Sequence, residues 1–216
     1  MEVRMQTHKA EKKGVIIYDF DGVLVNSRSA VKFYYAAILR HFGIPEPDWN
    51  DPYVSGRIFA MAHRQLLSQY ADGELLEKML CYSPPFTTQE MLDATPLEVG
   101  IAEIVPQLSV DYHLAICTNR GESVEAYLRH HNLHEHFSYA ITSKDVNNPK
   151  PDPEGIYKIL SYFSVSNALY IGDSEADYFA AKAAGVDFLS FKSSLFDSPV
   201  ITDHRDIKRF LTGLVE

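Results

Sequence analysis

The chain has 216 residues, 46% of them hydrophobic, and a formal net charge of −9 at pH 7, which fits one sizeable soluble domain or a domain with a modest insertion. The negative charge argues against broad contact with nucleic acid, and no apolar run approaches the roughly 18 residues that span a membrane. The two cysteines, Cys81 and Cys117, are far apart and indicate no disulfide framework, so we expect a cytoplasmic protein.

The first residues carry several charges but no apolar segment of a secretory signal, and we expect about ten of them to form a loose tail. Strand-like apolar runs then recur at residues 14–20, 112–118, 138–142, 167–173 and 186–191. Helical patterns follow the second and the fourth run, the latter Ala-rich with Gly185 at its expected end. Apolar strands that alternate with helices predict an α/β fold, with a parallel sheet covered on both faces.

The stretch between the first two strands breaks this alternation, because its patterns are helical throughout. Apolar residues recur at helical spacing in residues 29–44, 54–70 and 71–82. A further helix is expected where Thr87 and Glu90 have the spacing of a capping box. About 70 residues is too long for an ordinary crossover between strands, so we expect a small helical insert placed to act as a lid.

Polar residues stand at the carboxyl ends of three predicted strands, namely Asp19, Thr118 and Asp173. In parallel sheets the binding crevice lies at these ends. Asp19 and Asp21 are two residues apart, so their side chains point to the same side of an extended chain. Two adjacent carboxylates raise each other's pKa unless a cation is present, so the pair suits either a nucleophile with a general acid/base or an ordinary acidic turn.

Three further elements fit the chemistry of an anionic substrate. Thr118 offers a hydroxyl just before a helix start, where backbone amides can bind an anion, although a plain N-cap has the same appearance. Lys150 lies between two prolines that keep it out of a helix, which suits a fixed cation for phosphate or equally a surface lysine. Asp173 and Asp177 are four residues apart, so both carboxylates can reach one hard cation.

In chain order, the two aspartates, the threonine, the lysine and the GDSEAD sequence resemble the motifs of the haloacid dehalogenase superfamily of magnesium-dependent phosphohydrolases. The resemblance covers nearly the whole chain and is to the branch with a helical cap, which includes phosphoglycolate phosphatases and β-phosphoglucomutases. It implies a Rossmann-like parallel core of about five strands in residues 1–26 and 95–216, and an inserted α-helical cap domain in residues 27–94.

The resemblance also implies what each site residue does. Asp19 is expected to be the nucleophile and Asp21 the general acid/base, while Thr118, Asn119 and Lys150 are expected to bind phosphate. The expected Mg²⁺ ligands are the carboxylates of Asp19, Asp173 and Asp177 and the backbone carbonyl of Phe20, with Asp21 contributing its backbone or nothing. The implied reaction is hydrolysis of a small phosphorylated metabolite through an aspartyl-phosphate, by a monomer or homodimer.

Alternatives remain within and outside this family. Asp21 favours phosphate esters, because dehalogenases and phosphonatases lack an aspartate there. A phosphosugar mutase keeps the same motifs, but its cap usually offers a histidine soon after the first motif, whereas here the first is His41. A non-catalytic scaffold would be expected to lose a nucleophile or a metal carboxylate, and none is lost. A signalling receiver domain would be much shorter and would lack the insert.

Residues outside the motifs bear on specificity. Arg28 and Arg57 of the cap are candidates for binding a carboxylate or second phosphate of the substrate. Asn26 stands where phosphatase relatives commonly have aspartate, which bears on the substrate more than on catalysis. Four histidines fall within residues 130–136, and we interpret them as a solvated helix end rather than a zinc site.

Overall fold

The computed structural model describes residues 12–85 and 87–215, so the expected N-terminal tail lies outside the described residues. The chain divides into two compact units. One runs up to Val25 and resumes at Leu97, and the other is Asn26–Pro96. The first unit contains the sheet, and the second is built from helices.

The sheet of the first unit has six strands in the described residues: β1 (Val15–Tyr18), β2 (His113–Cys117), β3 (Tyr139–Ile141), β4 (Ala168–Gly172), β5 (Asp187–Phe191) and β6 (Val200–Ile201). Their order is β3-β2-β1-β4-β5-β6, and every neighbouring pair is parallel. This confirms the predicted α/β core. The sixth strand was not predicted, because its two residues are too short to give an apolar run.

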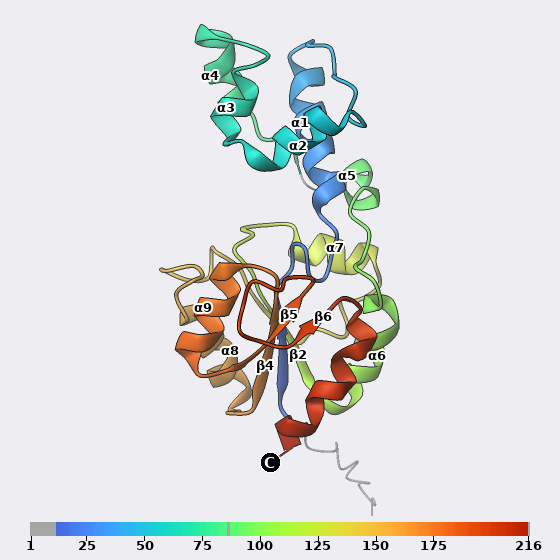
Figure 1. The fold of residues 1–216 in the computed structure, drawn as a ribbon, viewed down its shortest axis with the longest axis vertical. Coiled ribbons are helices and arrows are strands. Elements are labelled where there is room, and N and C mark those ends of the chain that lie inside the picture. The colour runs from blue at the N-terminus through green and yellow to red at the C-terminus, as the bar shows by residue number, and fades with distance from the viewer. Residues whose placement is uncertain (1–11, 86, 216) are drawn as a thin grey trace, which may run out of the picture. The chain divides into compact units, whose positions relative to one another are not determined.

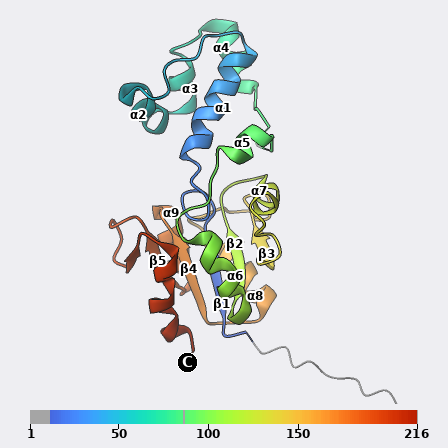
Figure 2. The same cartoon turned by 90° about the vertical axis from the view of Figure 1, so that its right-hand side faces the viewer.

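Helices cover both faces of this sheet (Figure 1). α8 (Glu154–Phe163) and α9 (Glu175–Ala184) lie on one side, and α6 (Ile101–Asp111) lies with the 3-10 helix η1 (His204–Val215) on the other. Figure 2 looks toward the second face, with α6 and η1 in front of the strands. All four residues of β1 are buried, as expected for a central strand covered on both sides.

The core between the sheet and helices α8 and α9 includes Tyr170, whose polar hydroxyl lies close to the strand ends. Alternate residues of a strand face opposite sides of the sheet, and Ile17 of β1 and Tyr170 of β4 face these helices. They pack with Ile156 and Ile159 of α8 and with Ala180 of α9. Tyr170 is thus an aromatic core residue whose hydroxyl lies next to the polar residues described below.

The helical unit contains α1 (Arg28–His41), α2 (Pro52–Ala60), α3 (His63–Leu67), α4 (Gly73–Cys81) and α5 (Gln89–Asp93). Residues 54–70 were predicted as one helical segment but form two helices, because Met61 and Ala62 have extended backbone conformations. The capping box predicted at Thr87 and Glu90 is wrong by one residue: Thr88 is the N-cap, and its hydroxyl accepts from the amide of Met91 at 3.3 Å.

This unit has an apolar core of its own. Its buried members are Tyr35, Ile38, Leu39, Ile58, Leu66, Leu67, Leu76 and Met79. They come from α1, α2, α3 and α4, so four short helices share one cluster. None of the helices in the described part of the chain is both long and apolar enough to cross a membrane.

Candidate active site

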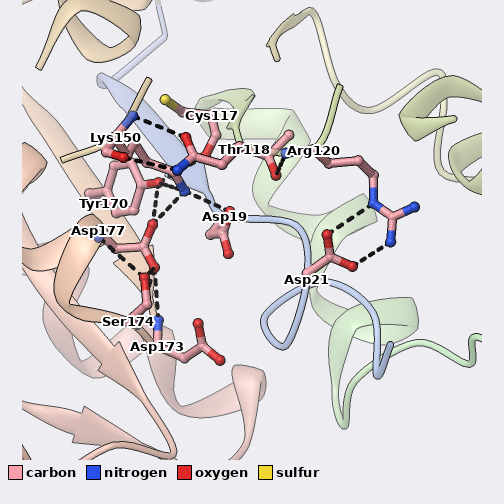
Figure 3. A network of polar contacts seen from close by, with 11 residues as sticks. Asp19, Asp21, Cys117, Thr118, Arg120, Lys150, Tyr170, Asp173, Ser174 and Asp177 are labelled. Carbon is pink, nitrogen blue, oxygen red and sulfur yellow. Dashed lines mark hydrogen bonds and ion pairs between the residues drawn. The ribbon is translucent and has the colours of Figure 1, made fainter. Parts of the chain in front are cut away.

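The polar residues at the carboxyl ends of β1, β2 and β4 lie together in the first unit (Figure 3). Asp19 and Thr118 are buried, and Asp173 is half-buried. The amide of Asp19 donates to the carbonyl of Ile171 at 2.9 Å, and the amide of Thr118 donates to the carbonyl of Ile141 at 3.0 Å. The hydrogen bonds of the sheet therefore continue to these residues and fix their backbones at one edge.

Lys150 is the centre of a buried polar network. Its Nζ donates to Asp19 Oδ1 at 2.7 Å and to Asp177 Oδ1 at 2.5 Å, and it lies 2.9 Å from the Tyr170 hydroxyl. Burial by itself would lower the pKa of this ammonium, but the charges of Asp19 and Asp177 outweigh that effect and the pKa is raised. Lys150 is therefore a fixed positive charge beside Asp19.

Asn119 holds the backbone of Lys150. Its Oδ1 accepts from the amide of Lys150 at 3.0 Å, and its Nδ2 donates to the carbonyl of Lys150 at 2.9 Å. The observed role of this side chain is thus to fix the lysine, and contact with phosphate stays a prediction. The hydroxyl of Thr118 accepts from the amide of Arg120 at 3.1 Å, which leaves its own proton available to a ligand.

Asp177 is fully buried at the start of α9 and accepts hydrogen bonds on both oxygens. Oδ2 accepts from the hydroxyl of Ser174 at 2.5 Å and from the amides of Ser174 and Asp173 at 3.1 and 3.3 Å. Ser174 is the N-cap of α9 and forms a capping box with Asp177. Oδ1 accepts from Lys150 and lies 2.9 Å from the Tyr170 hydroxyl, which is also 2.8 Å from the carbonyl of Cys117. These contacts use most of the roughly four lone-pair sites of a carboxylate.

Three carboxylates fit a divalent cation. Asp19, Asp173 and Asp177 each offer an oxygen, and these atoms lie within 4.8 Å of one another. Burial raises the pKa of Asp19 to about 7 in spite of Lys150, and burial together with the charge of Asp177 raises the pKa of Asp173 to about 6. A hard cation bound by these oxygens would favour their ionised forms, so the donor set suits such a metal.

Arg120 was not predicted from the sequence, although it stands two residues after Thr118. Its Nε and Nη2 donate to the two carboxylate oxygens of Asp21 at 2.9 and 2.6 Å, and its Nη1 donates to Ser123 Oγ at 3.0 Å. Figure 3 shows the guanidinium facing the Asp21 carboxylate, apart from the Lys150 network. Asp19 and Asp21 are therefore paired with different cations.

Residues 16–191 match the family model described as haloacid dehalogenase-like hydrolase. The chain belongs to this family. Among solved structures, a HAD-superfamily hydrolase of subfamily IA, variant 1, from Geobacter sulfurreducens superposes with a TM-score of 0.84 at 30% identity, over 92% of this chain and 96% of the other. The resemblance drawn from the motifs and the prediction of a HAD-family hydrolase are confirmed.

Two curated relatives of this haloacid dehalogenase-like hydrolase are named as phosphatases. Validoxylamine A 7'-phosphate phosphatase from Streptomyces hygroscopicus subsp. limoneus is 27% identical, over 80% of this chain and 82% of that protein. A phosphoglycolate phosphatase from Neisseria meningitidis is 28% identical, over 79% of this chain and 76% of that protein. The relatives thus agree in the class of enzyme, while their named substrates differ.

The backbone carbonyl of Phe20 was expected to bind the metal, and this expectation is wrong. The Phe20 oxygen accepts from the amides of Val23, Leu24 and Val25, at 3.4, 3.0 and 3.1 Å. These bonds occupy both lone pairs of the carbonyl. The cause is the tight turn at Gly22, whose φ of 80° folds the following residues back onto this carbonyl. Asp21 is then the remaining candidate for a main-chain ligand in this loop.

The candidate residues of the helical unit have partners within that unit. Arg57 donates to the Tyr53 hydroxyl at 3.2 Å and lies over the Tyr53 ring, 4.9 Å from its centroid. The amide of Arg28 donates to Asn26 Oδ1 at 3.2 Å, at the start of α1. Asn26 therefore contributes to the start of the helix, and binding of substrate by either arginine stays a prediction.

The histidines of residues 130–136 do not form a metal cluster in the structure. His136 Nδ1 lies 2.9 Å from Ser109 Oγ, and the rings of His130 and His131 pack edge to face. In residues 12–85 and 87–215, the group of three or more side chains with metal-binding spacing is the aspartate trio described above. His130 lies in the last turn of a helix and His131 is its C-cap, so two of the four histidines stand at a helix end.

Proposed function

We propose that this hydrolase is a Mg²⁺-dependent phosphatase that acts on a small phosphorylated metabolite through an aspartyl-phosphate on Asp19. The observation that supports this most is the buried Lys150 ammonium, 2.7 Å from Asp19 Oδ1. A fixed cation beside a carboxylate nucleophile can hold a phosphoryl oxygen in place and stabilise the charge that develops on it. Relatives named as phosphoglycolate phosphatase, and as pyrophosphatase PpaX in Bacillus mycoides at 22% identity, support the reaction class.

The proposed reaction has two halves. In the first, an oxygen of Asp19 forms a bond to phosphorus while the bond to the leaving oxygen breaks, and Asp21 gives its proton to that oxygen so that an alcohol departs. In the second, a water molecule gives a proton to Asp21, and the oxygen of that water forms a bond to phosphorus. The bond between phosphorus and Asp19 then breaks and inorganic phosphate leaves. The Thr118 hydroxyl donates a hydrogen bond to a phosphoryl oxygen throughout, and the charge of the Lys150 ammonium beside Asp19 stabilises the negative charge of the phosphoryl group.

Asp19 and Asp173 are the proposed direct ligands of the cation. Mg²⁺ would supply positive charge that stabilises the phosphoryl oxygens in both halves of the reaction. Asp177 is the third predicted ligand, but its oxygens already accept from Lys150, Tyr170 and the start of α9. Its main proposed role is therefore to hold Lys150 in place.

Substrate selection is proposed to lie in the helical unit. Arg28 and Arg57 are the candidates for binding a second anionic group, and both are cationic side chains on helices α1 and α2. We place the protein in the cytoplasm, as a monomer or homodimer, with a free phosphorylated metabolite as its substrate.

The test is hydrolysis of 4-nitrophenyl phosphate by the wild type and by Asp19→Asn, each with Mg²⁺ and with a chelator. We expect turnover by the wild type that needs Mg²⁺, and loss of activity in the variant by at least about 10³-fold. Asp187→Asn, which changes an exposed carboxylate of β5, is the matched control and should keep the activity. A folded wild type that hydrolyses neither this ester nor any of a panel of sugar, glycolate and nucleotide phosphates would contradict the proposal.

A further inference from the structure

The pairing of Arg120 with Asp21 has the geometry of a fixed clamp. Nε and Nη2 of the arginine each donate to a different oxygen of the carboxylate, which is the bidentate arrangement that gives both strength and direction. The arginine side chain is 13% exposed, whereas that of Asp21 is 37% exposed. The arginine is thus the buried partner, and the aspartate is the partner that solvent or a substrate can reach.

Several contacts fix the guanidinium itself. Its Cζ lies 5.3 Å from the ring centroids of both Phe20 and Tyr127, and both rings are fully buried. Its third nitrogen, Nη1, donates to Ser123 Oγ at 3.0 Å. Ser123 has a φ of 70°, a left-handed conformation that is unfavourable for residues other than glycine. The strained backbone places the serine hydroxyl where it holds the arginine.

The two neighbouring carboxylates are held by separate cations. Asp19 contacts Lys150, which follows β3, while Asp21 contacts Arg120, which follows β2. In addition, the ring of Phe20, the residue between the two aspartates, packs against the arginine. Asp21 is therefore held through its side chain by Arg120 and through its backbone by the turn that Phe20 begins.

We propose that Arg120 is a positioning residue for Asp21, which holds the carboxyl group at the angle required to pass a proton to the leaving oxygen. This inference rests on the proposed function, because it depends on Asp21 acting as the acid/base. The clamp uses two of the roughly four lone-pair sites of the carboxylate, so the outer sites remain for the proton and the substrate oxygen. Lysine is a point charge and cannot fix the plane of a carboxylate in this way.

A positioning role of Arg120 predicts that the effect of its loss depends on the leaving group, which a purely structural role does not predict. A strongly basic leaving oxygen must receive the proton of Asp21 while its bond to phosphorus breaks, whereas a nitrophenolate can depart as the anion. Loss of the clamp should therefore slow esters with poor leaving groups and spare those with good ones. General disruption of the site would slow all esters alike.

The experiment measures kcat/KM for phenyl, 4-nitrophenyl and 2,4-dinitrophenyl phosphate, with Mg²⁺ and at one pH, for the full chain. This parameter covers the steps up to departure of the phenol, so the second half of the reaction does not enter. For Arg120→Met we expect a loss of about 10- to 100-fold with phenyl phosphate and less than about threefold with the dinitrophenyl ester. The kcat/KM of Arg120→Lys with phenyl phosphate should lie between the values of Arg120→Met and the wild type.

Two comparisons complete the test. In an Asp21→Asn background, Arg120→Met should lower kcat/KM for phenyl phosphate by less than about threefold, because the arginine acts through Asp21. Arg129→Met removes an exposed arginine of α7 (Val124–His130) that pairs with Glu125, and this variant should have the kcat/KM of the wild type with all three esters.

Equal losses with all three esters, or additive losses in the double variant, would overturn the positioning role and leave the proposed function standing. If Asp21→Asn itself shows no dependence on the leaving group, the acid role of Asp21 fails and this inference fails with it. If circular dichroism shows that Arg120→Met is unfolded, Arg120→Lys decides by the same criteria.

Discussion

Lys150 donates a hydrogen bond to Asp19 across 131 positions of the chain, with 2.7 Å between Nζ and Oδ1. The same ammonium contacts Asp177 at the start of α9, and Asn119 holds its backbone at the end of β2. Lys150 therefore ties together, through its side chain and its backbone, segments that follow β1, β2 and β4. Because the network is buried, removal of one member leaves a polar or charged group without compensation.

Lys150→Met should destabilise the metal-free protein by roughly 3–5 kcal/mol, because two buried carboxylates lose the cation that they share. Urea unfolding in the presence of chelator measures this loss, and added Mg²⁺ should reduce it by supplying another cation. Lys158→Met is the control. Lys158 pairs with Glu154 on the surface of α8, so its loss should cost less than about 1 kcal/mol. Equal stability of Lys150→Met and the wild type under chelation would contradict the argument.

Asp19 should make the metal-free protein less stable as the pH rises. Burial raises its pKa from 3.8 to about 7, so between these values the native state holds a proton that the unfolded chain has lost. Its contribution is therefore greatest below about pH 4 and declines up to about pH 7. The measurement is the difference in unfolding free energy between the wild type and Asp19→Asn under chelation. With saturating Mg²⁺ the trend should reverse, since the metal binds the ionised carboxylate. A difference that does not vary with pH would speak against the raised pKa.

Gly22→Ala should impair the metal site more than it impairs the fold. Gly22 has a φ of 80°, and a Cβ at this position would overlap Oδ2 of Asp173. Gly185 also has a positive φ, 69°, but a Cβ there meets nothing within 4 Å. Both alanine variants should lose about 1 kcal/mol of stability from the backbone conformation. Only Gly22→Ala should weaken Mg²⁺ or Mn²⁺ binding, by at least about tenfold in calorimetry. Equal affinities in the two variants would count against Asp173 as a ligand.

The core fold could be predicted because its central strands are continuous apolar runs that end in polar residues. Such runs identify β1, β2 and β4 whatever their partners are. The two residues of β6 carry no such signal, since they pair with β5 only through the tertiary structure. The break at Met61 and Ala62 was hidden for a similar reason. The apolar spacing continues across it, and only the backbone conformation changes.

The candidate site was partly predictable for the same physical reason. Asp19, Thr118 and Asp173 stand directly after strands, so the parallel sheet brings them together. The partnership of Arg120 with Asp21 spans 99 positions and depends on how the rings of Phe20 and Tyr127 pack. No local pattern encodes that packing. The Phe20 carbonyl was expected as a metal ligand from the family resemblance alone, and the tight turn at Gly22 that directs the amides of Leu24 and Val25 onto this carbonyl lies outside the motifs compared.

His204 should make the protein less stable as the pH falls, opposite to the effect of Asp19. It is fully buried on η1, where Nε2 donates to the carbonyl of Val23 at 2.8 Å and the ring stacks on Phe191. Burial lowers its pKa from 6.5 to about 4, so between these values the unfolded chain binds a proton that the native histidine does not. The contribution of neutral His204 to the free energy of unfolding is of the order of 3 kcal/mol. It is fully present above about pH 6.5 and is lost as the pH falls toward 4.

His204→Gln keeps a neutral donor for Val23 and should be less stable than the wild type at pH 7. The difference in unfolding free energy between the two proteins, measured with urea, should become smaller toward about pH 4.5. A gap that stays constant with pH would show that His204 takes up a proton in the native state as readily as in the unfolded chain, and this would refute the prediction.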